Sequence, residues 1–182
     1  MKILETQRLV LQPLTLDDVD NLLGIFSDSE AMRYYPATKN RQETEAWIQW
    51  NLDSYSQQGF GLWAAIFKDS GQFVGQCGLV LQRNVEGQDE VEIGYSFLRK
   101  YWNRGFATEA ASASRDYGFE QFGLKRIVSL IHPQNRASRR VATKVGMSYE
   151  KETDRWNKRI CIYAIERLSH YCNKCASDLS CI

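Results

Sequence analysis

The chain has 182 residues and a mass of 21.0 kDa, with 43% hydrophobic and 25% charged residues. This length suits one domain with a sizeable core, and the composition excludes wholesale disorder, collagen-like repeats and a small disulfide-built protein. The net charge is +1, from 23 basic and 22 acidic residues, which argues against non-specific nucleic-acid binding. We find no apolar run of the roughly 20 residues that a membrane helix needs, and no signal-peptide pattern at the start. We therefore expect a cytoplasmic protein that binds neither nucleic acid nor membranes.

The charges divide unevenly along the sequence. Residues 1–98 carry a net charge of −7, and residues 99–182 carry a net charge of +8. In one interpretation, the C-terminal half binds an anionic ligand and the N-terminal half binds a cationic one. In the other, the two halves simply attract each other within the folded domain. The sequence favours neither interpretation.

The first part of the chain predicts one strand and two helices. Residues 5–13 alternate in polarity and predict a strand, and Thr15 is placed to cap the helix that follows. After a loop at residues 32–36, a second helix is predicted over about residues 41–56, closed by Gly59. Its inward face is predicted to hold Ala46, Trp47, Trp50 and Leu52.

The middle of the chain predicts three strands. Residues 62–67 and 73–81 form the first two, joined by a short hairpin connection at residues 68–71. A polar turn at residues 84–89 leads into the third strand, at residues 91–97.

The last part predicts two helices and three strands. A helix over residues 108–122 has a small inward face, which lets it lie close to a sheet. A strand at residues 126–131, a helix at 136–145, and two strands at 147–153 and 159–165 follow. This order predicts an α/β or α+β fold, a mixed sheet with helices on both faces. The small inward residues are Ala107, Ala110, Ala111, Ser114 and Gly118.

The segment that carries most chemical information is residues 101–109, Tyr-Trp-Asn-Arg-Gly-Phe-Ala-Thr-Glu, between a strand and a helix. Gly105 allows the backbone to approach a ligand closely. Amides at a helix start lack helical partners, and the helix dipole adds positive potential. Arg99, Lys100 and Arg104 add full charges, so the segment predicts a cradle for phosphate or pyrophosphate. The alternative is an ordinary strand-to-helix turn with solvated arginines, because the P-loop and GxGxxG patterns are both absent.

Five stretches of the sequence form a recognisable combination: residues 91–110, with the segment described above; 132–138, His-Pro-Gln-Asn-Arg-Ala-Ser; 144–147, Lys-Val-Gly-Met; 6–9, Thr-Gln-Arg-Leu; and 73–78, Phe-Val-Gly-Gln-Cys-Gly. Together they resemble the GNAT superfamily of acetyl-CoA-dependent N-acetyltransferases, in particular its RimJ/RimL-type branch of ribosomal-protein N-terminal acetyltransferases. The resemblance covers residues 5–167 and implies the GNAT (acyl-CoA N-acyltransferase) fold with a mostly antiparallel sheet. Asn103 stands where the superfamily's loop usually has Gly.

The resemblance implies a site for acetyl-CoA. Its pyrophosphate would bind the backbone of the loop and first helical turn, and its pantetheine would pair with a strand that bulges and separates from its neighbour. Asn135 would bond the pantetheine amides; the alternative is a turn or helix-cap role before Arg136. The implied cofactor-binding residues are Ile93, Tyr95, Phe97, Trp102, Asn103, Arg104, Gly105, Phe106, Ala107, Thr108 and Asn135.

Transfer to an amine needs a proton acceptor, because an amine attacks a thioester only when neutral. Glu92 is the first candidate, since the superfamily often places its base on this strand, and Glu90 on the same face is the second. The alternative is that Glu92 is an exposed strand carboxylate. Ser138 is implied as the proton donor to the leaving thiolate, because Ala142 stands where many relatives have a Tyr; a helix-cap role for Ser138 stays open.

The amine acceptor is predicted to meet Tyr34, Tyr35 and Trp63, whose aromatic faces suit a cation or a peptide end. Plain packing is the alternative for all three, and His132 is expected to be structural. By analogy with the RimJ/RimL-type branch, the leading acceptor is a protein N-terminal α-amino group. A small amine, such as a polyamine or a drug-like amine, is the alternative, and a CoA-binding sensor without catalysis is a second one.

The cysteines are expected to be free thiols, and the protein to be a monomer or homodimer. Residues 1–167 are predicted to form the domain, and residues 168–182 an unassigned tail with His170, Cys172, Cys175 and Cys181. These are zinc-ligand types, but a structural zinc site usually pairs two separated ligand pairs, and only one CxxC is present. We therefore expect no metal, with a zinc-dependent interaction protein as the competing hypothesis.

Overall fold

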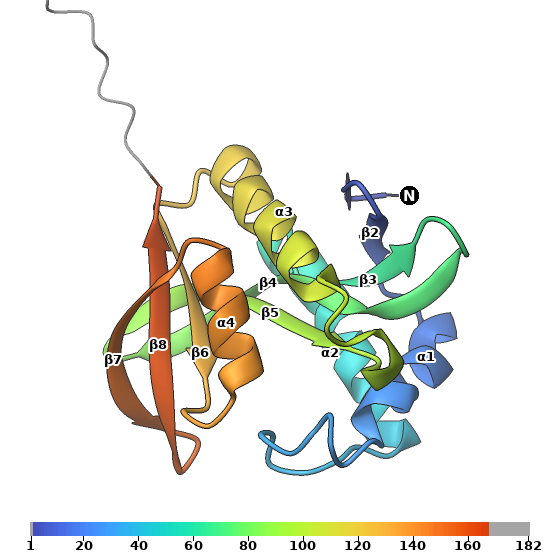
Figure 1. The fold of residues 1–182 in the computed structure, drawn as a ribbon, viewed down its shortest axis with the longest axis horizontal. Coiled ribbons are helices and arrows are strands. Elements are labelled where there is room, and N and C mark those ends of the chain that lie inside the picture. Colours follow the sequence, from blue (N-terminus) through green and yellow to red (C-terminus); the bar gives the residue numbers. More distant parts are fainter. Residues whose placement is uncertain (1, 168–182) are drawn as a thin grey trace, which may run out of the picture.

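The computed structural model describes residues 2–167 (Figure 1). The tail with its zinc-ligand residue types lies outside the described residues. Within them, eight strands form one sheet in the order β1-β2-β3-β4-β5-β6-β8-β7. The strands are β1 Leu4–Glu5, β2 Leu9–Pro13, β3 Leu62–Phe67, β4 Gln72–Val85, β5 Gln88–Phe97, β6 Arg126–Ile131, β7 Ser148–Arg155 and β8 Lys158–Glu166.

Every neighbouring pair of these strands is antiparallel except β5 and β6. The mixed, mostly antiparallel sheet that the sequence implies is therefore confirmed. Two consecutive parallel strands need a crossover connection, and the connection between β5 and β6 contains a helix.

The helices cover both faces of the sheet, with α3 and α4 in front of it and α2 behind it in Figure 1. One core cluster packs beneath α3 and α4 and includes Trp63, Phe106 and Ile127. A second joins α1 and α2 to the other face through Leu22 and Ile48. The helices are α1 Val19–Phe26, α2 Arg41–Gln58, α3 Phe106–Gln121 and α4 Arg136–Lys144, with short 3-10 turns at Leu16–Asp18 and Arg99–Tyr101. No helix among the described residues combines the length and apolar composition needed to cross a bilayer.

The close approach of α3 to the sheet follows from its small inward residues. Ala110, Ala111, Ser114 and Gly118 are all buried, as the sequence predicts. A Cβ atom at Gly118 would lie 3.0 Å from Ile127 and 3.2 Å from Leu79, so a larger side chain would push the helix outward.

The predicted inward face of α2 is wrong in part: Trp47 and Leu52 pack against the second core cluster as predicted, but Ala46 and Trp50 do not lie inward. Trp50 is 42% exposed and Ala46 is exposed, while Thr44, Ile48 and Asn51 are buried. Asn51 is buried because its side chain donates to the Trp47 carbonyl at 2.9 Å and accepts from the Leu62 N–H at 2.8 Å. A polar residue with both groups satisfied can lie inward, which hydrophobic periodicity does not detect.

Two boundary predictions are also corrected. The first predicted strand is two short strands, β1 and β2, paired with each other. The predicted polar turn at residues 84–89 is shorter, because Val85 pairs with Gln88 and only Glu86 and Gly87 form the loop. Both loop residues have positive φ, 51° and 89°, as a tight two-residue hairpin requires.

Candidate active site

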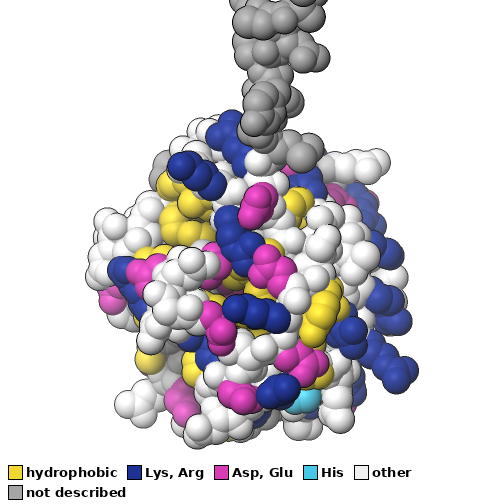
Figure 2. Space-filling view, turned by 90° about the vertical axis from the view of Figure 1, so that its left-hand side faces the viewer, with side chains coloured by type: hydrophobic (Ala, Val, Ile, Leu, Met, Phe, Trp, Pro, Cys, Tyr) yellow, Lys and Arg dark blue, Asp and Glu magenta, His cyan; other side chains and the backbone are white. Residues whose placement is uncertain are grey.

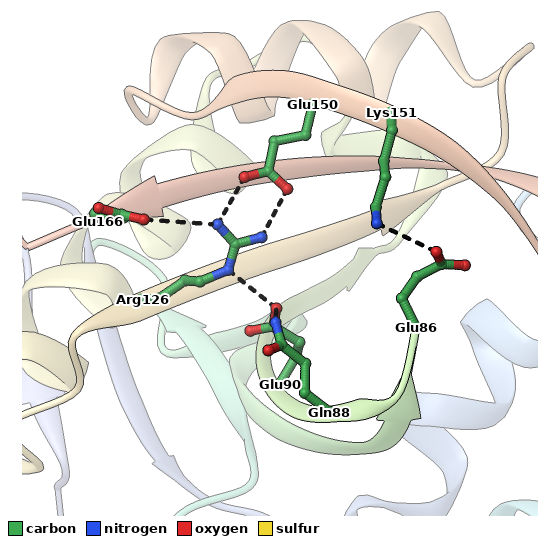
Figure 3. A network of polar contacts seen from close by, with 7 residues as sticks. All are labelled: Glu86, Gln88, Glu90, Arg126, Glu150, Lys151 and Glu166. Carbon is green, nitrogen blue, oxygen red and sulfur yellow. Dashed lines mark hydrogen bonds and ion pairs between the residues drawn. The ribbon is translucent and has the colours of Figure 1, made fainter.

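The sheet opens between its two parallel strands. β5 and β6 pair at one position, Glu92 with Val128, and separate beyond it. At the other end they are held together by Arg126, whose Nε donates to Glu90 at 3.0 Å and whose two Nη groups each donate to Glu150 on β7 at 2.7 Å (Figure 3). This network closes one end of the sheet and leaves the other end split.

The Arg126 network also shows what the uneven charge distribution does. Glu90 and Glu86 belong to the acidic half of the chain, and they pair with Arg126 and Lys151 of the basic half. On the side of the molecule in Figure 2, basic and acidic side chains lie side by side over much of the surface. Attraction between the two halves therefore accounts for part of the asymmetry.

The split leaves peptide groups of β5 facing the gap. The Ile93 carbonyl accepts from Ser129 Oγ at 3.2 Å, and the Phe97 carbonyl accepts from Trp102 Nε1 at 2.8 Å. Alternate residues of a strand direct their peptide groups to the same side, so those of Tyr95 point into the gap as well. The expected separation of the strands is confirmed. The expected bulge is wrong, because β4 and β5 keep a regular register from Gly75 and Phe97 to Gln82 and Glu90.

The turn before α3 presents free amides. Gly105 caps the helix with a φ of 84°, and Asn103 has a φ of 59°, in the left-handed region that Asn tolerates better than other side chains. Asn103 therefore fits the position where the superfamily usually has Gly. Phe106, Ala107 and Thr108 form the first helical turn, whose N–H groups lack helical partners. Together with the dipole of the 16-residue helix, they give this turn the local positive potential that suits an anion.

Two arginines fix this turn in place. Arg8 donates from Nη1 to the Arg104 carbonyl at 2.9 Å and from Nε to Glu109 at 2.7 Å. Its guanidinium lies 4.6 Å from the centre of the Phe106 ring, and that of Arg104 lies 5.2 Å from it. The Arg104 side chain thus stacks against aromatic rings and does not line the cleft.

A cleft of about 310 Å³ joins the turn before α3, the open edge of β5, the start of α4 and the loop between α1 and α2. The predicted site residues that line it are Tyr34, Tyr35, Tyr95, Phe97, Trp102, Asn103, Gly105, Phe106, Ala107, Thr108, Asn135 and Ser138. Tyr101, the first residue of the predicted cradle segment, and Arg33, next to Tyr34, line the cleft as well. The lining residues that the sequence did not point to are Ile25, Glu30, Ala31, Ser96, Ala137, Arg140, Val141 and Lys144.

Two of the missed residues are basic and follow a detectable pattern. Arg140 and Lys144 lie one helical turn apart on α4, and Arg136 lies one turn before them. Arg140 and Lys144 line the cleft, and neither forms an ion pair among the described residues. A basic stripe with a four-residue period was the available signal.

Asn135 and Ser138 form the start of α4. Asn135 caps the helix, and its side chain accepts from the Ser138 N–H at 3.1 Å, so the cap role that the sequence left open is present. The Ser138 carbonyl accepts from the Tyr95 hydroxyl at 3.2 Å, which ties α4 to β5 across the split. Burial raises the pKa of the Tyr95 phenol, so this hydroxyl stays protonated at neutral pH.

Glu92 lies where β5 and β6 pair, and its carboxyl group accepts two hydrogen bonds. Its Oε1 accepts from the Leu130 N–H at 3.1 Å and its Oε2 accepts from Gln82 Nε2 at 2.6 Å. Burial raises the pKa of Glu92 to about 7, against the lowering effect of these two donors. The carboxylate is partly buried and does not line the cleft itself, so any proton it accepts from a ligand there passes through a water molecule.

The loop between α1 and α2 spans the mouth of the split. The Tyr34 hydroxyl donates to the Gln134 carbonyl at 2.9 Å, and its ring stacks on His132 with centroids 5.1 Å apart. Lys158 Nζ donates to the Tyr35 carbonyl at 3.1 Å. Arg33 pairs with Glu30 at 2.7 Å, so the charges of this wall largely cancel.

Besides Arg104 and Glu92, three more candidate residues do not line the cleft. Trp63 is 1% exposed and packs edge-on against Tyr117 of α3, so it belongs to the core and contacts no acceptor. The Ile93 side chain is also in the core. Glu90, the second candidate for the base, is buried in its ion pair with Arg126 and lies outside the cleft lining.

The donor set of the cleft fits a phosphorylated cofactor. Free amides at one helix start and two cations on another suit a pyrophosphate, and the open edge of β5 suits an amide chain. Among residues 2–167, no group of three or more His, Cys, Asp or Glu side chains is arranged to hold a metal ion.

Known proteins resemble this chain in sequence and in fold. The sequence model of the family described as the acetyltransferase (GNAT) domain matches residues 8–148. YkkB of Bacillus subtilis (strain 168) is 42% identical over 168 residues, covering 92% of this chain and 96% of that protein. YoaA of the same strain, named as an uncharacterized N-acetyltransferase, is 32% identical over 151 residues, covering 81% and 84%. The crystal structure of a GNAT-family acetyltransferase from Bacillus anthracis superposes with a TM-score of 0.77 at 29% identity, covering 91% and 98%.

Proposed function

The chain belongs to the GNAT acetyltransferase family and is an acetyl-CoA-dependent acetyltransferase, and from this premise we propose that it acetylates the N-terminal α-amino group of a polypeptide. The single observation that supports the binding of the cofactor is the turn of free amides before α3, at the open end of the split sheet. When bound, acetyl-CoA supplies the thioester whose acetyl group is transferred.

The residues around the split then have distinct roles. The N–H groups of Gly105 to Thr108 would hold the pyrophosphate, with Arg140 and Lys144 adding positive charge. The peptide groups of Tyr95 would pair with the amide chain of the cofactor. They also place an N–H donor next to the carbonyl that becomes an oxyanion.

Proton transfer completes the proposal. Glu92 would accept the proton that the amine loses, through a water, and Ser138 would donate a proton to the sulfur as a carbon–nitrogen bond replaces the carbon–sulfur bond. Ser138 would then recover a proton from water. No acyl-enzyme forms, because the amine attacks the thioester directly.

Two observations favour an α-amino group as the acceptor. The acceptor wall carries one carboxylate, Glu30, and Arg33 already neutralises it, so the wall offers little to a multiply charged polyamine. A base with a pKa of about 7 also matches an α-amino group, whose pKa is about 8, better than an alkylamine with a pKa of about 10.4.

Similar proteins differ in the acceptors that their names give. The spermidine N(1)-acetyltransferase of Escherichia coli (strain K12) is 24% identical over 148 residues. A structure of RimL, named as a ribosomal L7/L12 alpha-N-protein acetyltransferase in complex with CoA, has a TM-score of 0.73 at 16% identity, which shows the fold alone. A small amine is therefore the alternative acceptor, and a CoA-binding sensor is the non-catalytic alternative.

A thiol-release assay with acetyl-CoA separates these functions. The panel comprises three acceptors. The first is a lysine-containing peptide with a free N-terminus, the second is the same peptide with an acetylated N-terminus, so that only its lysine amine is free, and the third is spermidine. We expect release with the first peptide, at a kcat/KM at least about tenfold above the other two. Preference for spermidine would support the small-amine alternative, and binding of CoA without release from any amine would support the sensor.

A further inference from the structure

The carboxylate of Glu92 is not isolated, because Gln82 lies between it and a cation. Gln82 precedes the β4–β5 hairpin loop, and its Nε2 donates to Glu92 Oε2 at 2.6 Å. Its Oε1 lies on the other side, 3.4 Å from Nη2 of Arg155 at the end of β7. Three residues from three strands are thus connected in a line.

Arg155 is held in place by the backbone of the hairpin. Its Nη1 donates to the Asn84 carbonyl at 2.9 Å, and its Nη2 donates to the Arg83 carbonyl at 2.8 Å. Its guanidinium also lies over the Trp156 ring, 4.7 Å from the centre. These contacts fix the direction from which Arg155 meets Gln82.

Donor and acceptor chemistry then fixes the orientation of the Gln82 amide. A guanidinium only donates, so the amide oxygen must face Arg155. The amide NH₂ is left facing Glu92, and a hydrogen bond from it favours the ionised carboxylate. The reverse orientation would place NH₂ against a donor and oxygen against a carboxylate.

Packing alone does not account for Arg155. Its Nε is buried and has no hydrogen-bond partner among the described residues. A buried donor without a hydrogen-bond partner destabilises a fold, so an arginine at this position needs another reason. Proximity to the ionised carboxylate of Glu92 supplies one.

We propose that Gln82 and Arg155 are positioning residues for Glu92, forming a relay that orients its carboxylate and keeps it ionised when the acceptor amine arrives. This inference rests on the proposed function, in which Glu92 accepts the proton. The other titratable groups that face Glu92 are the phenols of Tyr35 and Tyr95, on the α1–α2 loop and on β5, and both are neutral near pH 7. Arg155 is therefore the charged group among them.

The test compares Gln82→Met, Arg155→Met and Arg155→Lys with the wild type. Gln82→Met removes a donor to the ionised carboxylate, and Arg155→Met removes the nearby positive charge that acts on it. For both variants we expect the acidic limb of the kcat/KM profile to move up by about one pH unit. Arg155→Lys keeps the charge, so its limb should move by less. Arg83→Met is the matched control, because the Arg83 side chain pairs with exposed Asp89 and faces away from the relay.

An NMR titration that follows the carboxyl carbon of Glu92 measures the pKa of this group without turnover. The signal is assigned by its loss in Glu92→Gln. The proposal is overturned if Gln82→Met and Arg155→Met melt as folded proteins but leave the pKa of Glu92 and the acidic limb within about 0.2 units of the control. If the wild type acetylates no amine, the proposed function fails, while the NMR titration still decides whether the relay acts on Glu92.

Discussion

Arg8 and Glu109, 101 residues apart in the sequence, are joined by two hydrogen bonds. The Arg8 N–H donates to Glu109 Oε1 at 2.8 Å and the Arg8 Nε donates to Glu109 Oε2 at 2.7 Å. The same arginine donates to the Arg104 carbonyl, so the residue directly before β2 is linked to both ends of the turn that presents the free amides. The Thr-Gln-Arg-Leu stretch at the start of the chain thus has a physical role at the proposed cofactor site.

The first prediction concerns this link. Arg8→Lys keeps the charge but cannot donate in two directions with a planar fork. We expect the KM for acetyl-CoA to rise about tenfold with kcat within about twofold, because the turn loosens while the catalytic groups stay in place. Lys2→Met, which breaks an exposed pair with Glu5, is the control. An unchanged KM in the Arg8 variant would show that the turn keeps its shape without Arg8.

The second prediction concerns Glu92 and pH. With a pKa of about 7, Glu92 is protonated below neutrality and cannot accept a proton, so kcat/KM should fall as the pH drops from 8 to 6. Glu92→Gln should lower kcat by about 10²-fold or more and remove this limb. A profile that keeps its limb in the variant would assign the limb to another group.

The same pKa makes a stability prediction. The folded pKa of Glu92 is raised above its unfolded value of 4.5, so between pH 4.5 and 7 the folded state binds more protons than the unfolded state. This carboxyl therefore makes the protein less stable as the pH rises through that window, and the loss is complete above it. Glu92→Gln should melt at a higher temperature than the wild type at pH 8, with the difference shrinking toward pH 4.5. A lower melting temperature at pH 8 would contradict the burial of this carboxylate.

The third prediction concerns Asn103, whose backbone has a left-handed conformation before α3. Asn103→Gly should keep the turn, since Gly adopts a positive φ freely, while Asn103→Val should strain it. We expect the Kd for CoA in calorimetric titrations to stay within about twofold for Gly and to rise about tenfold for Val. Equal Kd values for the two variants would show that this backbone conformation does not matter for binding.

The fourth prediction concerns the cations of α4. Arg140→Gln and Lys144→Gln together should weaken CoA binding about tenfold and make it less dependent on salt, because exposed charges attract phosphate through a screened field. Arg159→Gln, on an exposed part of β8, is the control. Unchanged affinity in the double variant would place the phosphates of the cofactor away from α4.

The sequence predicts best those features of the site that one continuous segment forms. Gly105, the free amides and the helix start form one continuous segment, so the turn before α3 could be predicted from the sequence, while its binding of phosphate stays a prediction. Glu30 could not be assigned to the cleft, because only the folded loop brings it into the same cleft as α4. The link between Arg8 and Glu109 depends on contact between distant segments in the same way.

The wrong predictions have a shared cause. Trp63 was expected to meet an acceptor, but a strand residue points to one of two faces, and Trp63 points to α3. The inward face of α2 was misplaced because Asn51 is buried by its two hydrogen bonds and Trp50 is exposed. Hydrophobicity and alternation predict whether a residue is buried or exposed. They do not predict which neighbouring group forms a hydrogen bond with it or packs against it.

The central claim is that the cofactor diphosphate binds the free amides before α3, at the open end of the split sheet. A crystal structure of the protein with CoA tests it most directly. We predict phosphate oxygens within about 2.7–3.2 Å of backbone nitrogens between Gly105 and Thr108, with the amide chain alongside Tyr95. CoA bound elsewhere, with these amides facing only solvent or side chains, would contradict the account.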